Sequence, residues 1–412
     1  MNSGTVYIVG AGLSGLSAAV ALAAKGIRVE VLEATGGAGG RCRSYYDSAV
    51  DQIIDNGNHL ILSGNHSVHD YLQLIGSAEN FSGPARTEFA FAELPTAKRW
   101  TIKVNDGPLP WWTLDEKRRV PGTSAIDYLA FAGLMRPGGG KIPDGPLWQR
   151  LVRPLLLAAL NTEPETASPA LVATILRETI AKGGRAWRPR VASPTLAAAF
   201  VDPAVALIKR RGGTFRFGQR LRNLVFQGQV VQELQLPDAT LPLSTEDRVI
   251  LALPPWAATS LLPGLSAPDE FRAILSAHFR IAPRPDTPPI MGVIGGTAEW
   301  IFAFPDRVSV TISNADRLMD RDREELAAQC WKDVATVYGL PGDLPPWQIV
   351  KERRATFAAT PEQEAKRPGA KTQWGNLYLA GDWTGTGLPA TIESAVRSGR
   401  RAAELALGRG HV

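Results

Sequence analysis

Residues 5–41 read TVYIVGAGLSGLSAAVALAAKGIRVEVLEATGGAGGR, and this stretch decides the fold. Its first apolar run is short enough for one strand, and three glycines at G-x-G-x-x-G spacing follow it at once. A run of small residues then has the character of a helix, and a second apolar run ends at Glu33. We predict a strand at 6–9, a helix at 13–25 and a second strand at 27–32. This order is typical of the first half of a doubly wound α/β domain.

Each glycine of the first loop has a physical reason for its position. Gly10 permits the tight turn, Gly12 lets the backbone approach a pyrophosphate, and Gly15 lets helix and strand pack closely. The helix N-terminus adds free N–H groups and the positive end of its dipole. Glu33 can accept hydrogen bonds from a ribose 2′-hydroxyl and would repel a 2′-phosphate, which argues against NADP. We therefore expect the loop residues to bind a dinucleotide; they are Gly10, Ala11, Gly12, Leu13, Ser14 and Gly15.

The uncharged run could also be interpreted as a membrane span or a signal-peptide core. No basic residue precedes it, however, and neither alternative explains the strand and acid that follow the helix.

A second glycine loop follows Glu33 and indicates which dinucleotide is bound. Residues 34–44 read ATGGAGGRCRS. This resembles the second signature of the flavin-dependent amine oxidase and phytoene desaturase superfamily, in which an acid is followed by Gly-Gly-Arg and a small hydroxyl residue. The resemblance implies FAD as cofactor, with the arginine on its phosphates, and a guanidinium is well suited to a diphosphate. It places Ala34, Gly39, Gly40 and Arg41 in the cofactor site; the alternative is a flexible surface loop with an incidental arginine.

Composition bounds the class of protein. The chain has 412 residues, which favours two domains over one core, and its 44% hydrophobic and 21% charged content is ordinary for a globular protein. A net charge of +5 is too small to indicate nucleic-acid binding. Two distant cysteines, Cys42 and Cys330, predict neither a disulfide framework nor a metal site, and they favour a reducing, cytoplasmic location.

The expected fold class is α/β, with a Rossmann-type FAD-binding domain and an inserted mixed α+β substrate domain. The character of the sequence changes along the chain, and we divide it accordingly. We assign the FAD-binding domain to 1–85, 201–260 and 351–412, and the substrate domain to 86–200 and 261–350.

The turn-rich segment Asp55–His59 lies between apolar residues. In the superfamily the equivalent segment passes beside the flavin ring, which implies that Gly57, Asn58 and His59 contact the cofactor. His59 could exchange a proton near neutral pH, so it is the candidate catalytic residue. The alternative is a hydrogen-bonded structural histidine.

Residues 86–200 are basic, with sixteen Lys and Arg against ten Asp and Glu, and they hold five of the eleven tryptophans. Apolar helical stretches are expected at 125–135, 147–160 and 171–181. Such a segment fits a patch that docks on anionic lipid at a membrane surface. It fits equally a substrate domain with an ordinary core and a solubilising basic face.

The resemblance extends to two later segments. Near residue 225 the superfamily has a valine that contacts the adenine, and Val225 is the better match, with Leu224 as the alternative because only one of them can face the cofactor. At the C-terminal end a strand closes on Gly381 and Asp382, and a helix begins near Thr391 and Ile392. In the superfamily this aspartate binds the ribityl or phosphate region, and the helix N-terminus points at the flavin edge that becomes negative on reduction.

Within the superfamily the chain most resembles the squalene-associated FAD-dependent desaturase group, over nearly its full length. The narrower match depends on Asp55–His59, on Leu155–Ser168 and on Gly381–Ser394. This group removes the hydroxyl of hydroxysqualene in bacterial hopanoid synthesis. The resemblance therefore implies hydride transfer from N5 of reduced FAD to an allylic carbon, with His59 as candidate general acid. It also implies a polyisoprenoid substrate and contact with neighbouring enzymes of isoprenoid synthesis.

Three alternatives remain open from the sequence. A carotenoid-type desaturase would transfer hydride from substrate to FAD. An amine oxidase is disfavoured. Those enzymes resemble one another in a lysine held by water near the flavin N5 and in an aromatic residue before the C-terminal helix, whereas here no lysine lies between Lys209 and Lys332 and the aligned residue is Thr391. The third alternative is a non-catalytic FAD-binding scaffold.

Overall fold

The computed structural model describes residues 4–136, 140, 142 and 144–408. A parallel five-stranded sheet at its base gathers segments from three distant parts of the chain, in the order β10-β2-β1-β14-β20. Its strands are rich in buried aliphatic residues, as a parallel sheet covered on both faces requires. They are β1 (Thr5–Val9), β2 (Arg28–Leu32), β10 (Thr214–Arg216), β14 (Arg248–Leu251) and β20 (Leu377–Leu379).

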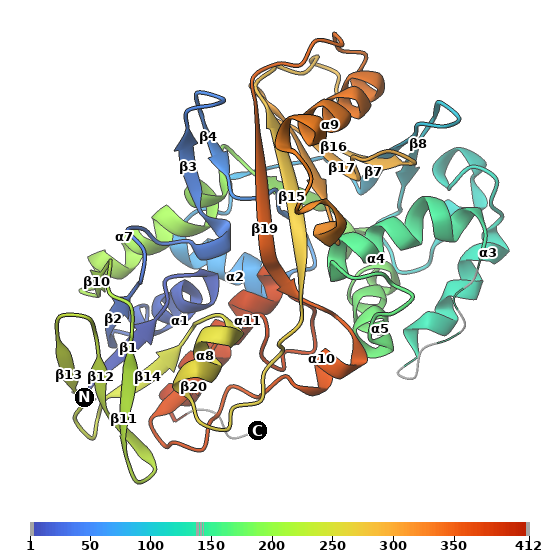
Figure 1. Ribbon diagram of the computed structural model, residues 1–412. Helices are drawn as coiled ribbons and strands as arrows, with labels where there is room; N and C mark the ends of the chain where they lie inside the picture. The colour runs from blue at the N-terminus through green and yellow to red at the C-terminus, as the bar shows by residue number, and fades with distance from the viewer. Residues whose placement is uncertain (1–3, 137–139, 141, 143, 409–412) are drawn as a thin grey trace.

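Helices from distant parts of the chain cover this sheet (Figure 1). They are α1 (Leu13–Ala23), α2 (His66–Ile75), α7 (Asp202–Arg210), α8 (Pro255–Leu261) and α11 (Ile392–Ala406). Small residues let α1 and α11 approach closely. A Cβ at Gly399 would lie 2.0 Å from the Ser14 carbonyl oxygen, and one at Gly15 would lie 1.9 Å from the Gly10 carbonyl oxygen. The expected role of Gly15 in close packing therefore matches its surroundings.

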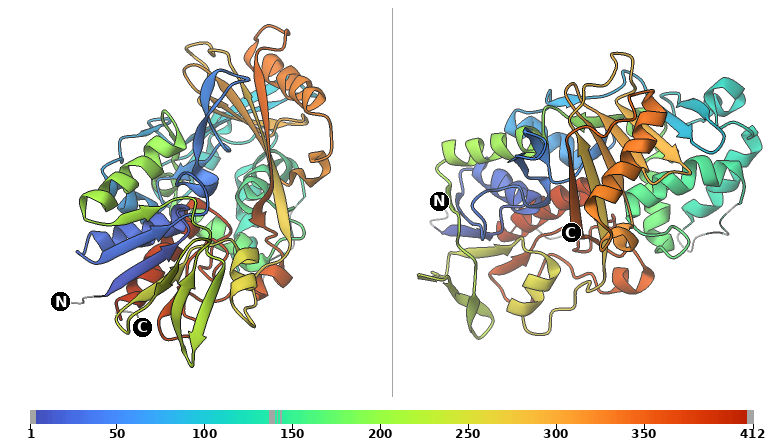
Figure 2. Two further views of the ribbon diagram at one scale, coloured as in Figure 1. Left: turned by 60° about the vertical axis from the view of Figure 1, so that its left-hand side comes forward. Right: turned by 45° about the horizontal axis from the view of Figure 1, so that its top comes forward.

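A second, seven-stranded sheet stands above the first in the order β19-β15-β18-β17-β16-β7-β8 (Figures 1 and 2). Only the β16–β7 pairing is parallel. Helix α9 (Arg323–Tyr338) buries Trp331 against the Phe279 ring of this sheet. The strands are β7 (Glu88–Glu93), β8 (Lys98–Lys103), β15 (Phe271–Phe279), β16 (Ile290–Ile294), β17 (Trp300–Ala303), β18 (Val308–Ile312) and β19 (Trp347–Phe357). The domain boundary that we place after residue 350 falls inside β19.

Short helices lie beside the second sheet, at the right of Figure 1. The expected helix at 147–160 is helical throughout and contains a π-helical turn at Trp148–Val152, next to Pro154, which lacks an amide donor. These helices are α3 (Ala125–Ala130), α4 (Arg153–Leu160) and α5 (Pro169–Glu178). Two further short helices are α6 (Gly184–Trp187) and α10 (Pro361–Ala365), and α10 lies in the lower half of Figure 1. The single turns are η1 (Gly40–Cys42), η2 (Trp111–Leu114), η3 (Glu116–Arg118), η4 (Phe131–Met135), η5 (Trp148–Val152), η6 (Ile180–Lys182), η7 (Ala197–Val201) and η8 (Ala315–Leu318).

Three small antiparallel sheets complete the fold. They contain β3 (Ser44–Asp47) with β4 (Gln52–Asp55), β5 (Leu60–Leu62) with β9 (Pro189–Ala192) and β6 (Phe81–Ser82), and β11 (Asn223–Gln227) with β12 (Val230–Gln235) and β13 (Thr240–Pro242). None of the helices in the described part of the chain has the length and apolarity needed to cross a bilayer.

Candidate functional site

The first glycine loop leads from β1 into α1. The Gly10 amide donates to the Leu32 carbonyl at 2.7 Å, which ties the turn to β2. Gly12 precedes α1, and no side chain caps the helix there. A Cβ at Gly12 would meet no atom within 4 Å, so this backbone faces open space. A pyrophosphate can therefore approach the helix N-terminus as the sequence predicts.

The second glycine loop lies directly against the first. The Gly39 amide donates to the Ala11 carbonyl at 2.8 Å, and a Cβ at Gly40 would lie only 3.2 Å from the Gly12 Cα. The Glu33 carboxylate accepts a hydrogen bond from the Ala11 amide at 2.8 Å, and the exposed Ala34 follows it. The acid and both loops thus meet at one end of the parallel strands, which is where open α/β sheets bind their ligands.

Arg41 of the second loop reaches a segment 341 residues further along the chain. Its guanidinium forms an ion pair with the Asp382 carboxylate at 2.8 Å. Asp382 is buried and follows β20 directly after Gly381. The structure therefore brings together the two residues that the resemblance assigns to the phosphates and to the ribityl or phosphate region.

The C-terminal helix α11 begins beside this pair. The Thr391 hydroxyl accepts from the Ser394 amide at 3.2 Å and so caps the helix, whose first residue is the buried Ile392. Glu393 is also buried, and its carboxylate accepts from the amides of Ser67 and Val68, at 3.2 and 3.0 Å. This residue caps α2, so the helix predicted to face the flavin is fixed to the rest of the nucleotide domain.

The segment Asp55–His59 follows β4 and contacts β3 and the second sheet. The Asp55 carboxylate accepts from the Ser44 hydroxyl at 2.6 Å and from the Leu196 amide at 2.9 Å. The Asn58 amide nitrogen donates to the Thr311 hydroxyl of β18 at 3.0 Å. Its buried Oδ1 accepts no hydrogen bond from the described residues, as suits a group that faces a ligand donor.

His59 follows this anchor, and its environment disfavours the charged form of its ring. Burial, together with the positive charge of Arg41, lowers the pKa of His59 to about 4. The imidazole is therefore neutral at pH 7 and can donate or accept a hydrogen bond through its ring nitrogens. An imidazolium acid is not the form present at neutral pH.

The two candidates for the adenine contact lie on opposite faces of β11. Leu224 is buried in the core, whereas Val225 is only half-buried. The Val225 side chain is therefore less used by the core than that of Leu224, and its contact with the adenine stays a prediction.

Sequence reasoning missed residues that hold the C-terminal loop in shape. The buried Arg367 donates to the carbonyls of Asp382 and Trp383 at 3.3 Å and also to that of Thr384. The Ser398 hydroxyl of α11 accepts from the Gly381 amide at 2.9 Å. Neither residue belongs to a motif, and the contacts depend on the folded path of the loop.

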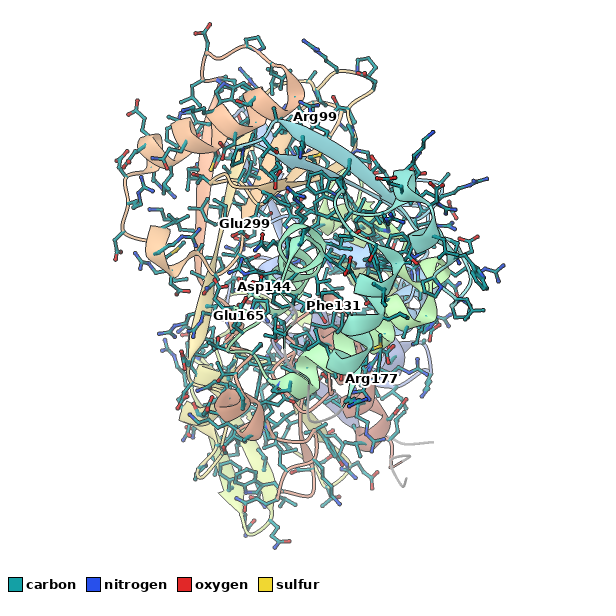
Figure 3. The ribbon with its side chains drawn as sticks, turned by 90° about the vertical axis from the view of Figure 1, so that its right-hand side faces the viewer. Arg99, Phe131, Asp144, Glu165, Arg177 and Glu299 are labelled. Carbon is teal, nitrogen blue, oxygen red and sulfur yellow. The ribbon has the colours of Figure 1, made fainter. Side chains whose placement is uncertain are left out.

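Glu299 is a further carboxyl group, half-buried, directly before β17 and labelled in Figure 3. Burial raises the pKa of Glu299 to about 7, and its carboxylate accepts from the Ser313 amide at 2.7 Å. Across the described residues, no three His, Cys, Asp or Glu side chains gather as the ligands of a metal would.

These features suit a dinucleotide with a diphosphate. Its phosphates match the open space at Gly12, the uncapped N-terminus of α1 and the guanidinium of Arg41. Its hydrogen-bond donors match the unused acceptor on Asn58. Gly10 to Gly15, Glu33, Arg41 and Asp382 are the residues that would hold it. Together with the parallel sheet, they define a dinucleotide-binding protein of the α/β class.

The particular family follows from comparison with known proteins. The chain belongs to the flavin containing amine oxidoreductases, whose family model matches residues 13–407. It is 53% identical to a hydroxysqualene dehydroxylase of Rhodopseudomonas palustris over 99% of both chains, and 53% identical to one of Sinorhizobium fredii over 98% of both. The solved structure of cyclohexylamine oxidase from Brevibacterium oxydans covers 98% of both chains with a TM-score of 0.71 at 15% identity, which shows the shared fold. The expected fold class and the expected cofactor, FAD, are confirmed, and the protein is an FAD-dependent oxidoreductase.

Proposed function

We propose that this oxidoreductase reductively removes the hydroxyl group of hydroxysqualene and releases squalene. The observation that carries the proposal is 53% identity, over nearly the whole of each chain, to two proteins of that activity. In the reaction a carbon–oxygen bond breaks, the hydroxyl takes up a proton that comes from solvent and leaves as water, and a carbon–hydrogen bond forms. Reduced FAD supplies the hydride for that bond.

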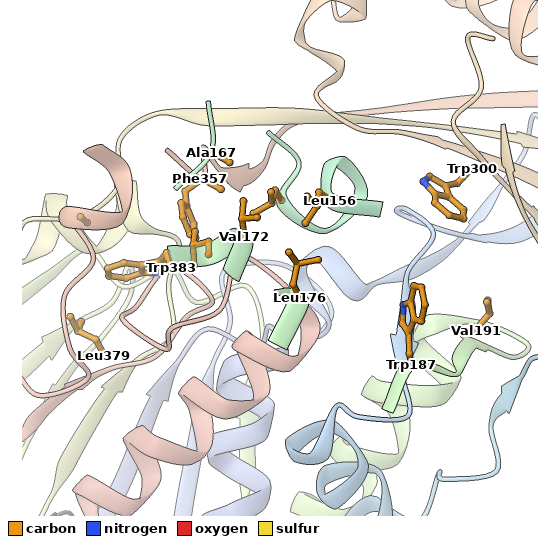
Figure 4. Packing of buried hydrophobic residues seen from close by; sticks show 14 of the residues in the cluster. Leu156, Ala167, Val172, Leu176, Trp187, Val191, Trp300, Phe357, Leu379 and Trp383 are labelled. Carbon is orange, nitrogen blue, oxygen red and sulfur yellow. The ribbon is translucent and has the colours of Figure 1, made fainter. Parts of the chain in front are cut away.

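The protein must hold a long apolar chain away from water. Apolar side chains from α4, α5 and β17 belong to one core cluster, which includes Leu156, Leu176 and Trp300 (Figure 4). The same cluster continues to Phe357 and to Trp383, the residue that follows Asp382. We assign the polyisoprenoid to this side of the molecule, where a dry environment protects a developing allylic cation from water.

His59 is the residue that we place next to the leaving hydroxyl. Because its pKa is about 4, we assign it the role of a neutral hydrogen-bond donor to the departing oxygen. Gly57 and Asn58 hold it in position, since Asn58 is tied to β18.

Two further parts of the proposal concern location. We propose that the protein works in the cytoplasm at the membrane surface, because its substrate dissolves in the bilayer. Association with neighbouring enzymes of isoprenoid synthesis would pass this substrate between active sites.

Steady-state assays test the proposal. Hydroxysqualene is offered to the FAD-loaded protein with a chemical reductant, phytoene and a primary amine are each offered to the oxidised FAD-loaded protein with an electron acceptor, and the products are identified by mass spectrometry. We expect squalene from hydroxysqualene and no product from the other two. Desaturation of phytoene by the oxidised enzyme, without squalene formation, would support the carotenoid-type alternative instead.

A further inference from the structure

An exposed apolar patch lies on the helical side of the molecule, and nothing in the cofactor site explains it. Its five side chains are 59–72% exposed; they are Leu109, Trp111, Leu114, Ile126 and Leu129. They make up five of the eleven exposed large apolar side chains in the described part of the chain, within a stretch of 21 residues. Single exposed apolar residues are ordinary, whereas a cluster of this kind marks an interaction surface.

The two elements that carry most of the patch pack against each other. The buried Trp112 ring of η2 meets the Tyr128 ring of α3 edge to face, with centroids 5.0 Å apart. Trp111 is the neighbour of Trp112, yet it is 64% exposed. The turn η2 and the helix α3 therefore each pack one side against the core and expose apolar side chains on the other side. Helix α3 lies at the right-hand edge of Figure 1, far from β1, and Figure 3 looks onto this side.

Basic side chains accompany the patch. Residues 98–136 hold seven Lys and Arg against four Asp and Glu, and this excess lies on the segments that flank the patch, because 109–129 holds three of each. Arg118 lies against β8, where its Nε donates to the Lys103 carbonyl at 3.0 Å, so both residues adjoin η2 and η3. Two of the acids serve the backbone, since Asp115 accepts from the Lys117 amide and Asp127 from the Ser124 amide. The aromatic and aliphatic anchors thus lie on a stretch without net charge, and the segments that flank it in the sequence are basic.

We propose that the exposed apolar patch inserts into the headgroup region of an anionic lipid bilayer. Exposed tryptophan and leucine side chains supply the apolar contact, and the basic residues supply attraction to anionic headgroups. This inference deepens the proposed function and rests on it for the identity of the lipid-soluble substrate. It adds which face meets the membrane.

The core beneath the patch connects it with the cofactor loops. Trp112 and Phe131 lie under the patch in the same apolar cluster that contains Leu156, Phe357 and Trp383. Figure 4 shows the inner part of this cluster, from Leu156 to Trp383.

Vesicle co-sedimentation of the FAD-loaded protein tests the proposal. The patch variant carries W111S, L114Q, I126Q and L129Q, and the control carries I53Q and L74Q, at positions 55% and 51% exposed outside the patch. On phosphatidylcholine vesicles with about one third phosphatidylglycerol, we expect the patch variant to lose at least about tenfold in partition coefficient. The control should bind like the parent, and added salt or pure phosphatidylcholine should weaken binding of the parent.

Two outcomes would overturn the proposal. One is binding of the patch variant that equals the parent's, and the other is absence of vesicle binding by the parent. A dimer of the parent that the patch variant abolishes, without vesicle binding, would assign the patch to a second copy instead. Retained flavin absorbance in every variant shows that the fold is intact.

Detergent-dispersed hydroxysqualene separates this proposal from the proposed function. The patch variant should turn over the dispersed substrate like the parent, yet lose turnover of substrate embedded in vesicles. No turnover by the parent in detergent would contradict the proposed function, whatever the vesicles show.

Discussion

At the residue scale, His59 is the side chain on which the proposed chemistry depends most. We expect His59→Gln to slow squalene formation by about tenfold to a hundredfold, the loss that follows when one hydrogen bond to a developing charge is weakened. His66→Gln, at an exposed position on α2, is the matched control and should keep the parent rate. Single-turnover rates give the comparison, and a full rate in His59→Gln would remove this residue from the chemistry.

His278 makes the stability of the protein dependent on pH. Burial lowers the pKa of His278 to about 3, and its Nδ1 lies 2.8 Å from the Ser309 hydroxyl. Because an unfolded histidine titrates near 6.5, the unfolded state takes up a proton between pH 7 and pH 5 that the native state does not. We expect this single group to lower the free energy of unfolding by about 2 kcal/mol over that interval.

Urea titrations at several pH values measure this effect. The variant His278→Gln should lose less stability than the parent as the pH falls from 7 to 5, whereas His66→Gln should follow the parent. A parent-like pH dependence in His278→Gln would show that the ring is protonated, or exposed, in the native state.

Residues within motifs could be predicted from sequence, and residues outside them could not. The fingerprint glycines and the Arg41 loop have fixed spacing because backbone and phosphate impose it. Arg367 supports the same site through carbonyls of the Asp382 loop, and no spacing rule describes such contacts. The lowered pKa of His59 could not be predicted from the sequence either, because it depends on burial and on the charge of Arg41 in another loop.

At the element scale, the first glycine loop offers a direct test of cofactor binding. A Cβ at Gly12 would meet no protein atom within 4 Å. The same is true of a Cβ at Gly36 in the second loop. We expect Gly12→Ala to fold normally but to bind FAD at least about tenfold more weakly, because the methyl group occupies the pyrophosphate's path. Gly36→Ala should keep its FAD.

Flavin absorbance after gel filtration, together with circular dichroism, reads out binding and folding separately. A Gly12→Ala protein that keeps a full complement of flavin would contradict the assigned path of the pyrophosphate.

Regular elements of the nucleotide domain could be predicted closely, and those of the helical part less so. The expected strand at 6–9 is β1, and the expected helix at 13–25 is α1. The expected helix at 125–135 is instead a six-residue helix followed by a 3-10 turn. Periodicity indicates an apolar face but does not set where packing interrupts a helix.

At the scale of the whole molecule, the cofactor site exists because three segments of the chain meet. β1 pairs with β14, and β14 pairs with β20, so the residues around 10, 250 and 380 reach one edge. The resemblance implied this convergence, and the fold class is confirmed. Pairing of β7 with β16, which joins the two substrate segments into one sheet, could not be predicted because no local pattern specifies a distant partner. The division into five segments stays a prediction.

One measurement tests the central claim most directly. The FAD-loaded protein is reduced without oxygen, mixed with hydroxysqualene, and followed by flavin absorbance while the lipid is analysed. The account predicts that the flavin reoxidises and that one squalene forms for each flavin. Flavin that stays reduced in the presence of bound hydroxysqualene, with no squalene formed, would contradict it.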